Sequence, residues 1–191
     1  MIAHKEQRVG IFIDIQNLYH SAKNLYNARV NYKELIRNLL AGRKLIRAIA
    51  YVVKSEGIVD ATAPTTPTGT PQRAEERRER GLSTEAAFFE ALKQAGLELR
   101  TKDLQVYPGG MKKADWDVGM AVDSIRTAPG LDTIILVTGD GDFIPLVDYL
   151  RWGLGREVEV AAFSRTASGK LKEVADRFTA IEEVPRSLIK K

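Results

Sequence analysis

Residues 136–142 read LVTGDGD, an apolar run that ends in two aspartates with a glycine on each side of the first. The run begins at Thr133 and is rich in β-branched residues, so it predicts a buried strand over 133–138. Asp140 and Asp142 then follow the carboxyl end of that strand. They are either ordinary turn residues, as Asp and Gly often are, or part of a charged site. The other strand ends decide between these interpretations.

Four more segments have the character of strands. The runs 9–13, 45–53 and 158–163 are almost continuously apolar, and 97–102 alternates. Continuous apolar runs are typical of parallel strands that are covered on both faces. Helical periodicity lies between them at 32–40, 88–95, 118–125, 143–152 and 168–177. This alternation predicts right-handed βαβ crossovers and a three-layer α/β/α fold, with a mostly parallel central sheet in the order 3-2-1-4-5.

Two of these helices carry expectations about single residues. The 118–125 helix is predicted to bury an apolar face made of Val118, Ala121, Val122 and Ile125. Asp117 then lies at the edge of this face and Asp123 nearly opposite to it. Asp142 is the predicted N-cap of the 143–152 helix.

Length and composition favour one domain over 1–191, because 191 residues that are 44% hydrophobic can bury a sizeable core. The Thr/Pro-rich and charged stretch 58–83 is predicted to be a flexible insertion, and 183–191 a basic tail. No cysteine and only two histidines are present, which argues against disulfides and zinc centres. No apolar run could span a membrane and no signal peptide is visible, so we expect a cytoplasmic protein.

A second strand also ends in an acid, because Asp14 directly follows the first apolar run. In open parallel sheets, ligands bind beyond the carboxyl ends of the strands, where the strand order reverses. In the predicted order the first and fourth strands are neighbours, so Asp14 and Asp140 converge. Asp117 can lie along the same edge from the start of its helix, and Asp115 is a charge that the helix dipole favours there.

Carboxylates that are packed together repel one another and stay ionised only when cations offset the repulsion. No basic residue adjoins Asp14 or Asp140 in the sequence. An all-oxygen ligand set without Cys or His suits Mg²⁺ or Mn²⁺, which can also neutralise a phosphodiester. A net charge of +4 is compatible with a nucleic acid as partner. The acids therefore predict phosphoryl chemistry, most simply hydrolysis.

Three segments carry a resemblance to a known family: FIDIQNL at 12–18, WDVGMAVD at 116–123 and LVTGDGDFIPLVDYLRWGLGREVEV at 136–160. In order and spacing they resemble the NYN domain family, in the LabA-like branch of the PIN-like nucleases, over about residues 8–182. The resemblance implies a PIN-like α/β/α fold and an endoribonuclease site that depends on Mg²⁺ or Mn²⁺, with RNA as the partner.

The resemblance also implies which residues form the site. The catalytic set is Asp14, Asn17, Asp117, Asp140 and Asp142, and its four aspartates bind the metal, Asp14 and Asp140 being the main ligands. The second tier is Asp123, Asp115 and Thr138, where threonine replaces the commoner serine. Lys112 and Lys113 are candidates for the lysine that often precedes the helix motif and would contact substrate phosphate.

For each of five residues, two interpretations remain open. Asn17 either orients a water or a phosphate oxygen or is an ordinary residue of a helix start. Thr138 either bonds a carboxylate or simply finishes its strand. Trp116 and Tyr107 either stack on bases or pack at the core and its rim. Lys113 either meets phosphate or is a solvated loop charge.

The favoured prediction is a metal-dependent endoribonuclease, and the alternative is a non-catalytic RNA-binding or regulatory NYN-domain protein. A phosphohydrolase acting on a small molecule is disfavoured, because Gln16 stands where an aspartyl-phosphate DxD pattern needs its second aspartate. The chain also lacks GxxxxGK[ST] and GxGxxG. The sequence leaves the oligomeric state open, so a homo-oligomer remains possible.

Overall fold

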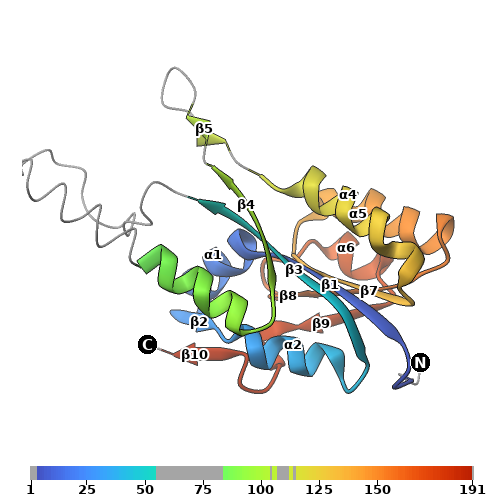
Figure 1. The fold of residues 1–191 in the computed structure, drawn as a ribbon, viewed down its shortest axis with the longest axis horizontal. Coiled ribbons are helices and arrows are strands. Elements are labelled where there is room, and N and C mark those ends of the chain that lie inside the picture. The colour runs from blue at the N-terminus through green and yellow to red at the C-terminus, as the bar shows by residue number, and fades with distance from the viewer. Residues whose placement is uncertain (1–3, 55–83, 104, 107–111, 114, 191) are drawn as a thin grey trace, which may run out of the picture.

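The fold is built around a six-stranded sheet in which every neighbouring pair of strands is parallel (Figure 1). The computed structural model describes residues 4–54, 84–103, 105–106, 112–113 and 115–190. The strands are β1 Arg8–Asp14, β3 Lys44–Lys54, β4 Glu98–Asp103, β7 Thr133–Val137, β8 Glu157–Ala162 and β9 Arg177–Ala180. Their order, β4-β3-β1-β7-β8-β9, confirms the predicted 3-2-1-4-5 and adds β9 as an edge strand.

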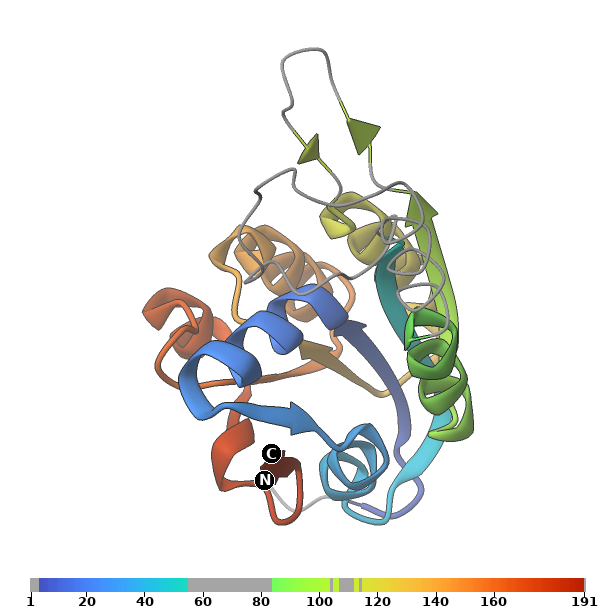
Figure 2. The same ribbon diagram turned by 90° about the vertical axis from the view of Figure 1, so that its left-hand side faces the viewer.

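Helices cover both faces of this sheet (Figures 1 and 2). One face carries α1 Ile15–Tyr26, α2 Tyr32–Leu40 and a helix over 84–94, and the other carries α4 Asp117–Thr127, α5 Ile144–Asp148 and α6 Gly169–Val174. Successive side chains of a strand point to opposite faces, so Ile11 and Ile13 join the first core while Phe12 joins the second. The predicted three-layer α/β/α fold is confirmed.

Shorter elements complete the described chain. Two antiparallel pairs lie outside the main sheet: β2 Ala28–Val30 with β10 Leu188–Lys190, and β5 Gln105–Val106 with β6 Lys112–Lys113. The remaining turns are η1 Ala128–Gly130, η2 Gly141–Phe143, η4 Ile181–Glu183 and the π-helical η3 Tyr149–Gly153. The basic segment 183–191 thus contributes a strand, whereas the predicted insertion 58–83 lies outside the described residues. No helix within the described ranges is long and apolar enough to cross a membrane.

The predicted apolar face of helix α4 is wrong. Three of its members are exposed, with exposed fractions of 75% for Val118, 46% for Val122 and 37% for Ile125. Met120 and Ser124 are buried instead. The cause is a polar contact with the sheet, because the Asp123 carboxylate accepts a hydrogen bond of 3.1 Å from the Tyr51 hydroxyl of β3. This bond requires the side of α4 that carries Asp123 to face the sheet.

Two other predicted helices differ in detail. The 143–152 segment is helical throughout, but it is divided among the end of η2, the short α5 and the π-helical η3. The 168–177 helix ends at Val174, as α6, because the chain then begins to pair with β8. Asp176 donates its N–H to the carbonyl of Val158 at 2.9 Å and accepts the Val158 N–H on its carboxylate at 2.8 Å. This pairing leads directly into β9.

A buried ion pair ties the turn between α2 and β3 to strand β8. Arg43 donates hydrogen bonds of 2.8 and 2.9 Å to Glu159, and the two side chains are 1% and 3% exposed. Removing one partner leaves a buried charge unpaired, which costs about 3–5 kcal/mol. Glu159→Ala should therefore lower the free energy of unfolding by that amount in denaturant titrations. Arg37→Ala, which breaks an exposed pair with Glu34, should change it by less than about 0.5 kcal/mol, and equal effects would contradict the assignment.

Candidate active site

Two neighbouring strands bring Asp14 and Asp140 to one edge of the sheet. The strand order reverses between β1 and β7, which are paired so that Ile13 lies opposite Val137. Asp14 is the last residue of β1, and Asp140 follows β7 after Thr138 and Gly139. The convergence that the strand order predicted is therefore present in the fold.

Both acids are also helix caps. The side chain of Asp14 accepts the N–H of Asn17 at 3.1 Å and caps α1. The side chain of Asp140 accepts the N–H of Asp142 at 2.9 Å and caps η2. The expectation that Asp142 would be the cap is wrong, because the chain already turns at Gly141 into the 3-10 turn that precedes α5. Capping holds each carboxylate in place and puts it at the positive end of a helical turn.

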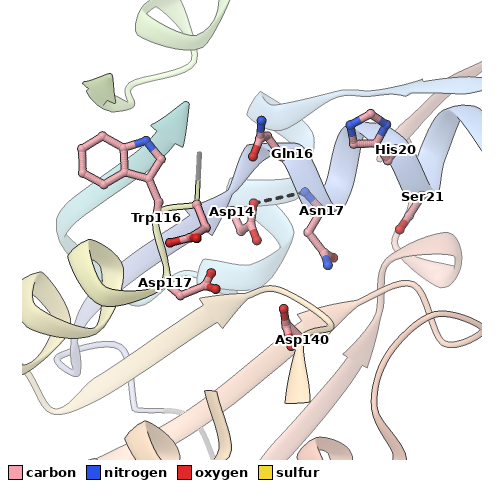
Figure 3. A pocket seen from close by; sticks show the side chains of 9 residues that line it. Asp14, Gln16, Asn17, His20, Ser21, Trp116, Asp117 and Asp140 are labelled. Atoms are coloured by element: carbon pink, nitrogen blue, oxygen red, sulfur yellow. Dashed lines mark hydrogen bonds between the residues drawn. The ribbon is translucent and has the colours of Figure 1, made fainter. Parts of the chain in front are cut away.

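A cavity of about 400 Å³ lies over this edge of the sheet (Figure 3). Its lining consists of Asp14, Gln16, Asn17, His20, Ser21, Asp115, Trp116, Asp117 and Asp140. Of the residues predicted to be catalytic, Asp14, Asn17, Asp117 and Asp140 thus meet here from β1, α1, α4 and the loop after β7. Asp142 is exposed and is not among the lining residues.

Asn17 joins helix α1 to the loop after β7. Its side-chain oxygen accepts the N–H of Gly139 at 3.2 Å. Because the oxygen is turned toward Gly139, the amide nitrogen with its two N–H donors points another way, on a side chain that lines the cavity. Asn17 therefore has a structural role in the loop after β7, and its amide nitrogen takes no part in that bond.

Burial and the charges of neighbouring acids raise the pKa values of Asp117 and Asp14. The pKa of Asp117 is raised to about 6, first by desolvation and then by the charges of Asp115, Asp14, Asp140 and Asp142. Burial is also the main cause that raises the pKa of Asp14, although backbone hydrogen bonds lower it in part. In the part of the chain that the structure describes, no lysine or arginine forms an ion pair with Asp14, Asp117 or Asp140. The site therefore favours a bound cation.

The donor set suits a hard divalent ion that keeps part of its water. Carboxylate and amide oxygens are the ligands that Mg²⁺ and Mn²⁺ prefer. Among the described residues, no three acidic or histidine side chains are close enough together to form a ready-made metal site. Mg²⁺ is usually held by one or two carboxylates and several waters, and a cavity of about 400 Å³ has room for both. The residues present therefore fit such an ion.

The second-tier residues have different surroundings. Asp115 lines the cavity. Thr138 is fully buried, and its hydroxyl accepts the N–H of Asp140 at 3.3 Å, so it supports the turn rather than a carboxylate. Asp123 lies outside the lining, because its carboxylate is bonded to Tyr51 and pairs with Arg100 at 3.3 Å.

Three predicted contacts fall wholly or partly outside the described residues. Lys112 and Lys113 form strand β6, but their side chains are outside the description, and so is Tyr107. Lys102 of β4 does lie near the cavity, since its Nζ donates to the backbone carbonyl of Asp115 at 3.4 Å. The sequence interpretation missed this lysine.

The wall that α1 contributes was also missed. Gln16, His20 and Ser21 line the cavity together with Asn17. A signal was present, because Asp14 caps a segment whose apolar residues recur at helical spacing and are buried: Ile15, Leu18 and Ala22. That spacing puts Gln16 with His20, and Asn17 with Ser21, in rows four residues apart.

A parallel α/β/α sheet with aspartates at the carboxyl edge, beside the reversal of strand order, places this chain among the PIN-like folds. The sequence model of the NYN domain family matches residues 8–182, and the chain belongs to that family. The resemblance carried by the three motif segments is confirmed.

Two relatives extend this comparison over the whole chain. The protein named low amplitude and bright protein LabA, from Synechococcus elongatus, is 24% identical over 199 residues, which cover 100% of this chain and 91% of that protein. A solved structure of a protein of unknown function from Vibrio parahaemolyticus is 26% identical and superposes with a TM-score of 0.74, covering 99% of this chain and 100% of that chain.

Proposed function

We propose that this protein is a ribonuclease that depends on Mg²⁺ or Mn²⁺ and hydrolyses phosphodiester bonds within an RNA strand. One observation carries the proposal: Asp14, Asp117 and Asp140 line a single cavity at the carboxyl edge of the sheet. The NYN family is related to the PIN-like nucleases, which supports the same reaction class. The raised pKa values of Asp14 and Asp117 support a bound cation, because a positive charge in the cavity would stabilise the ionised carboxylates.

We assign a role to each residue from its position in the site. Asp14, Asp117 and Asp140 would hold the ion, and Asp142 would support it through water. When bound, such an ion activates a water molecule for attack and offsets the charge that develops on the phosphate. The amide N–H groups of Asn17 would hold a phosphate oxygen in line with that attack.

RNA is the proposed substrate because basic residues outside the acidic cavity can attract a polyanion to it. The chain has a net charge of +4. Lys102 lies beside Asp115 at the rim of the cavity, and β6 carries Lys112 and Lys113. Lysines at the rim position backbone phosphates without reading the sequence of bases.

A non-catalytic RNA-binding or regulatory protein is the second candidate. The observation that favours it is the lack of a ready-made metal site among the described residues. A pure binder would keep salt-dependent affinity for RNA, because phosphate contacts release counterions, but it would show no turnover.

The test is a time course with end-labelled single-stranded RNA in Mn²⁺, in Mg²⁺ and in EDTA. The proposal predicts fragments in the presence of metal and none in EDTA. Their ends should be 5′-phosphate and 3′-hydroxyl, the products expected when water attacks the phosphorus, the bond to the 3′ oxygen breaks and that oxygen takes up a proton. Salt-dependent binding without fragments would favour the second candidate. Faster hydrolysis of a small phosphate ester than of RNA would reject both.

A further inference from the structure

Helix α4 carries Asp117 as its first residue, yet it begins without a side-chain cap. The N-cap position is Trp116, which makes no capping hydrogen bond. The first N–H groups of a helix have no partner within the helix, and a helix start without a cap is less well held. The position of Asp117 over the cavity must therefore depend on contacts other than capping.

One such contact is made by Trp116 itself. Its indole Nε1 donates to the carbonyl of Val52 in β3 at 3.0 Å. Its ring lies against the ring of Tyr51, with centroids 5.5 Å apart and a tilt of 56°. The residue directly before Asp117 is thus fastened to the central sheet, at the edge of the cavity that Figure 3 shows.

Gly119 makes room for this indole. A Cβ built on Gly119 would lie 2.5 Å and 2.9 Å from two ring carbons of Trp116, closer than real Cβ atoms come to other atoms. Glycine inside a helix is unfavourable compared with alanine. Any other residue here would force the indole or the helix to shift.

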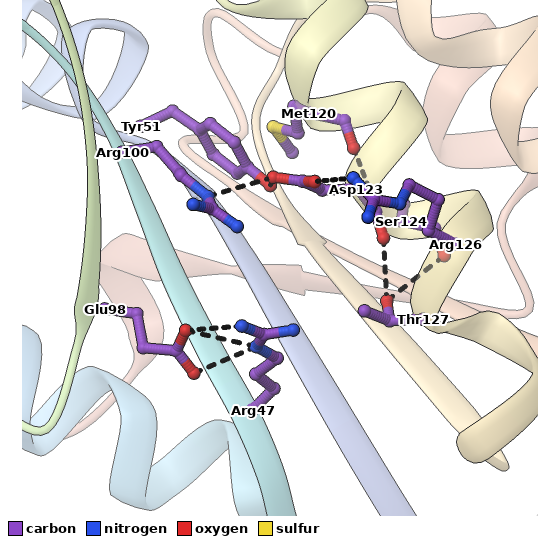
Figure 4. Close-up of polar contacts among 9 residues, drawn as sticks. All are labelled: Arg47, Tyr51, Glu98, Arg100, Met120, Asp123, Ser124, Arg126 and Thr127. Atoms are coloured by element: carbon purple, nitrogen blue, oxygen red, sulfur yellow. Dashed lines mark hydrogen bonds and ion pairs between the residues drawn. The ribbon is translucent and has the colours of Figure 1, made fainter.

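A second contact holds the same helix about two turns further along. Asp123 follows Trp116 by seven residues, which is about two turns, so both lie on the side of α4 that faces the sheet. The Asp123 carboxylate accepts the Tyr51 hydroxyl at 3.1 Å and pairs with Arg100 at 3.3 Å (Figure 4). Tyr51 therefore touches both points at which α4 is fastened.

We infer that Tyr51, Trp116, Gly119 and Asp123, here called the Tyr51 anchor, fix the start of α4 on β3 and thereby place the Asp117 carboxylate opposite Asp14 and Asp140. Asp123 is then a positioning residue and not a metal ligand. The inference rests on the proposed function in one respect, namely that Asp117 binds the metal. If the anchor positions Asp117, changes in the anchor should alter metal affinity more than they alter the stability of the fold.

The chain offers its own optical probe for this inference. It contains two tryptophans, and Trp152 is 80% exposed and outside the cavity lining. In a Trp152→Phe background, the emission of Trp116 reports the contact with Val52. Paramagnetic Mn²⁺ bound in the cavity quenches the same indole, so one titration gives both the state of the anchor and the metal affinity.

Gly119→Ala in that background should shift the Trp116 emission to longer wavelength and weaken Mn²⁺ binding by about 10–100-fold, the usual effect of disturbing an outer-shell partner. The melting temperature should fall by only a few degrees, because the better helix propensity of alanine, worth about 1 kcal/mol, offsets part of the cost of the displaced indole and its lost hydrogen bond. The matched control is Gly130→Ala, because nothing lies within 4 Å of a Cβ at that position. Unchanged emission and affinity in Gly119→Ala, or equal losses in the control, would overturn the inference.

Two substitutions of Asp123 distinguish a positioning role from a metal-ligand role for this residue. They also test the inference if Gly119→Ala fails to fold. Asp123→Asn keeps an oxygen that can accept the Tyr51 hydroxyl, whereas Asp123→Ala removes it. A positioning role predicts that Asp123→Asn keeps most of the Mn²⁺ affinity and Asp123→Ala loses about tenfold. A ligand role predicts similar losses in both. If the parent protein binds no Mn²⁺ at all, it is the proposed function that fails.

Discussion

Asp14→Asn should lower the rate of Mn²⁺-dependent RNA cleavage by about 10³-fold or more while the protein stays folded. A catalytic metal ion supplies several kcal/mol of transition-state stabilisation, and about 1.36 kcal/mol corresponds to tenfold in rate. Asparagine has the same shape and is an equally good N-cap, so the bond to the N–H of Asn17 can persist. The checks are the cleavage rate at saturating Mn²⁺ and the circular dichroism spectrum of each protein.

The matched control for this result is Asp148→Asn. Asp148 is exposed on α5 and is not part of the cavity lining. The same loss of one negative charge should leave its cleavage rate near that of the parent protein. An Asp14→Asn protein that cleaves as fast as Asp148→Asn would show that the carboxylate at the end of β1 takes no part in the reaction.

Asp117→Asn should stabilise the metal-free protein at neutral pH and abolish its metal binding. The pKa of Asp117 is raised to about 6 from the ordinary 3.8, so the folded protein holds this proton more tightly than the unfolded chain does. The favourable contribution of the protonated carboxyl is complete below about pH 4 and is lost as the pH rises through 6. A neutral amide avoids that loss. Because Asp117 is partly solvated, the gain is limited to about 1 kcal/mol, or about 2–4 °C in melting temperature.

Melting curves in EDTA at pH 7 and pH 4 check this expectation. The variant should melt higher than the parent at pH 7 and close to it at pH 4. An excess of Mn²⁺, at about 100 times its Kd, adds about 2.7 kcal/mol, or about 5–10 °C, to a protein that binds it. Only the parent should gain this increment at pH 7. A variant that is less stable than the parent in EDTA at pH 7 would contradict the claim that burial, and then the neighbouring acids, disfavour the ionised Asp117 carboxylate.

Much of the fold follows from where the apolar runs end. Five runs separated by helical patterns indicate a parallel sheet with right-handed crossovers, and 3-2-1-4-5 is one of the common strand orders of such doubly wound sheets. That order alone brings Asp14 beside Asp140, which is why this half of the site was predictable. The edge strand β9 was not, since its four residues are half-buried and carry no apolar run.

The parts of the site on α4 and α1 depend on contacts that the spacing of apolar residues in the sequence does not reveal. The apolar residues of α4 indicated the wrong buried side, because Trp116 and Asp123 bond to β3 and turn the helix toward them. Such bonds depend on where Tyr51 and Val52 stand in space. The polar wall of α1 went unnoticed for a different reason: Asp14 was treated as a ligand and not also as the cap that starts a helix.

The account is tested most directly by one cleavage assay with two proteins. The parent and the Asp14→Asn/Asp140→Asn double variant are incubated with the same labelled RNA, with and without Mn²⁺. We expect fragments only from the parent and only with Mn²⁺, while both proteins keep the same circular dichroism spectrum. Equal Mn²⁺-dependent cleavage by the double variant would contradict the claim that these two strand-end aspartates hold the metal that cuts RNA.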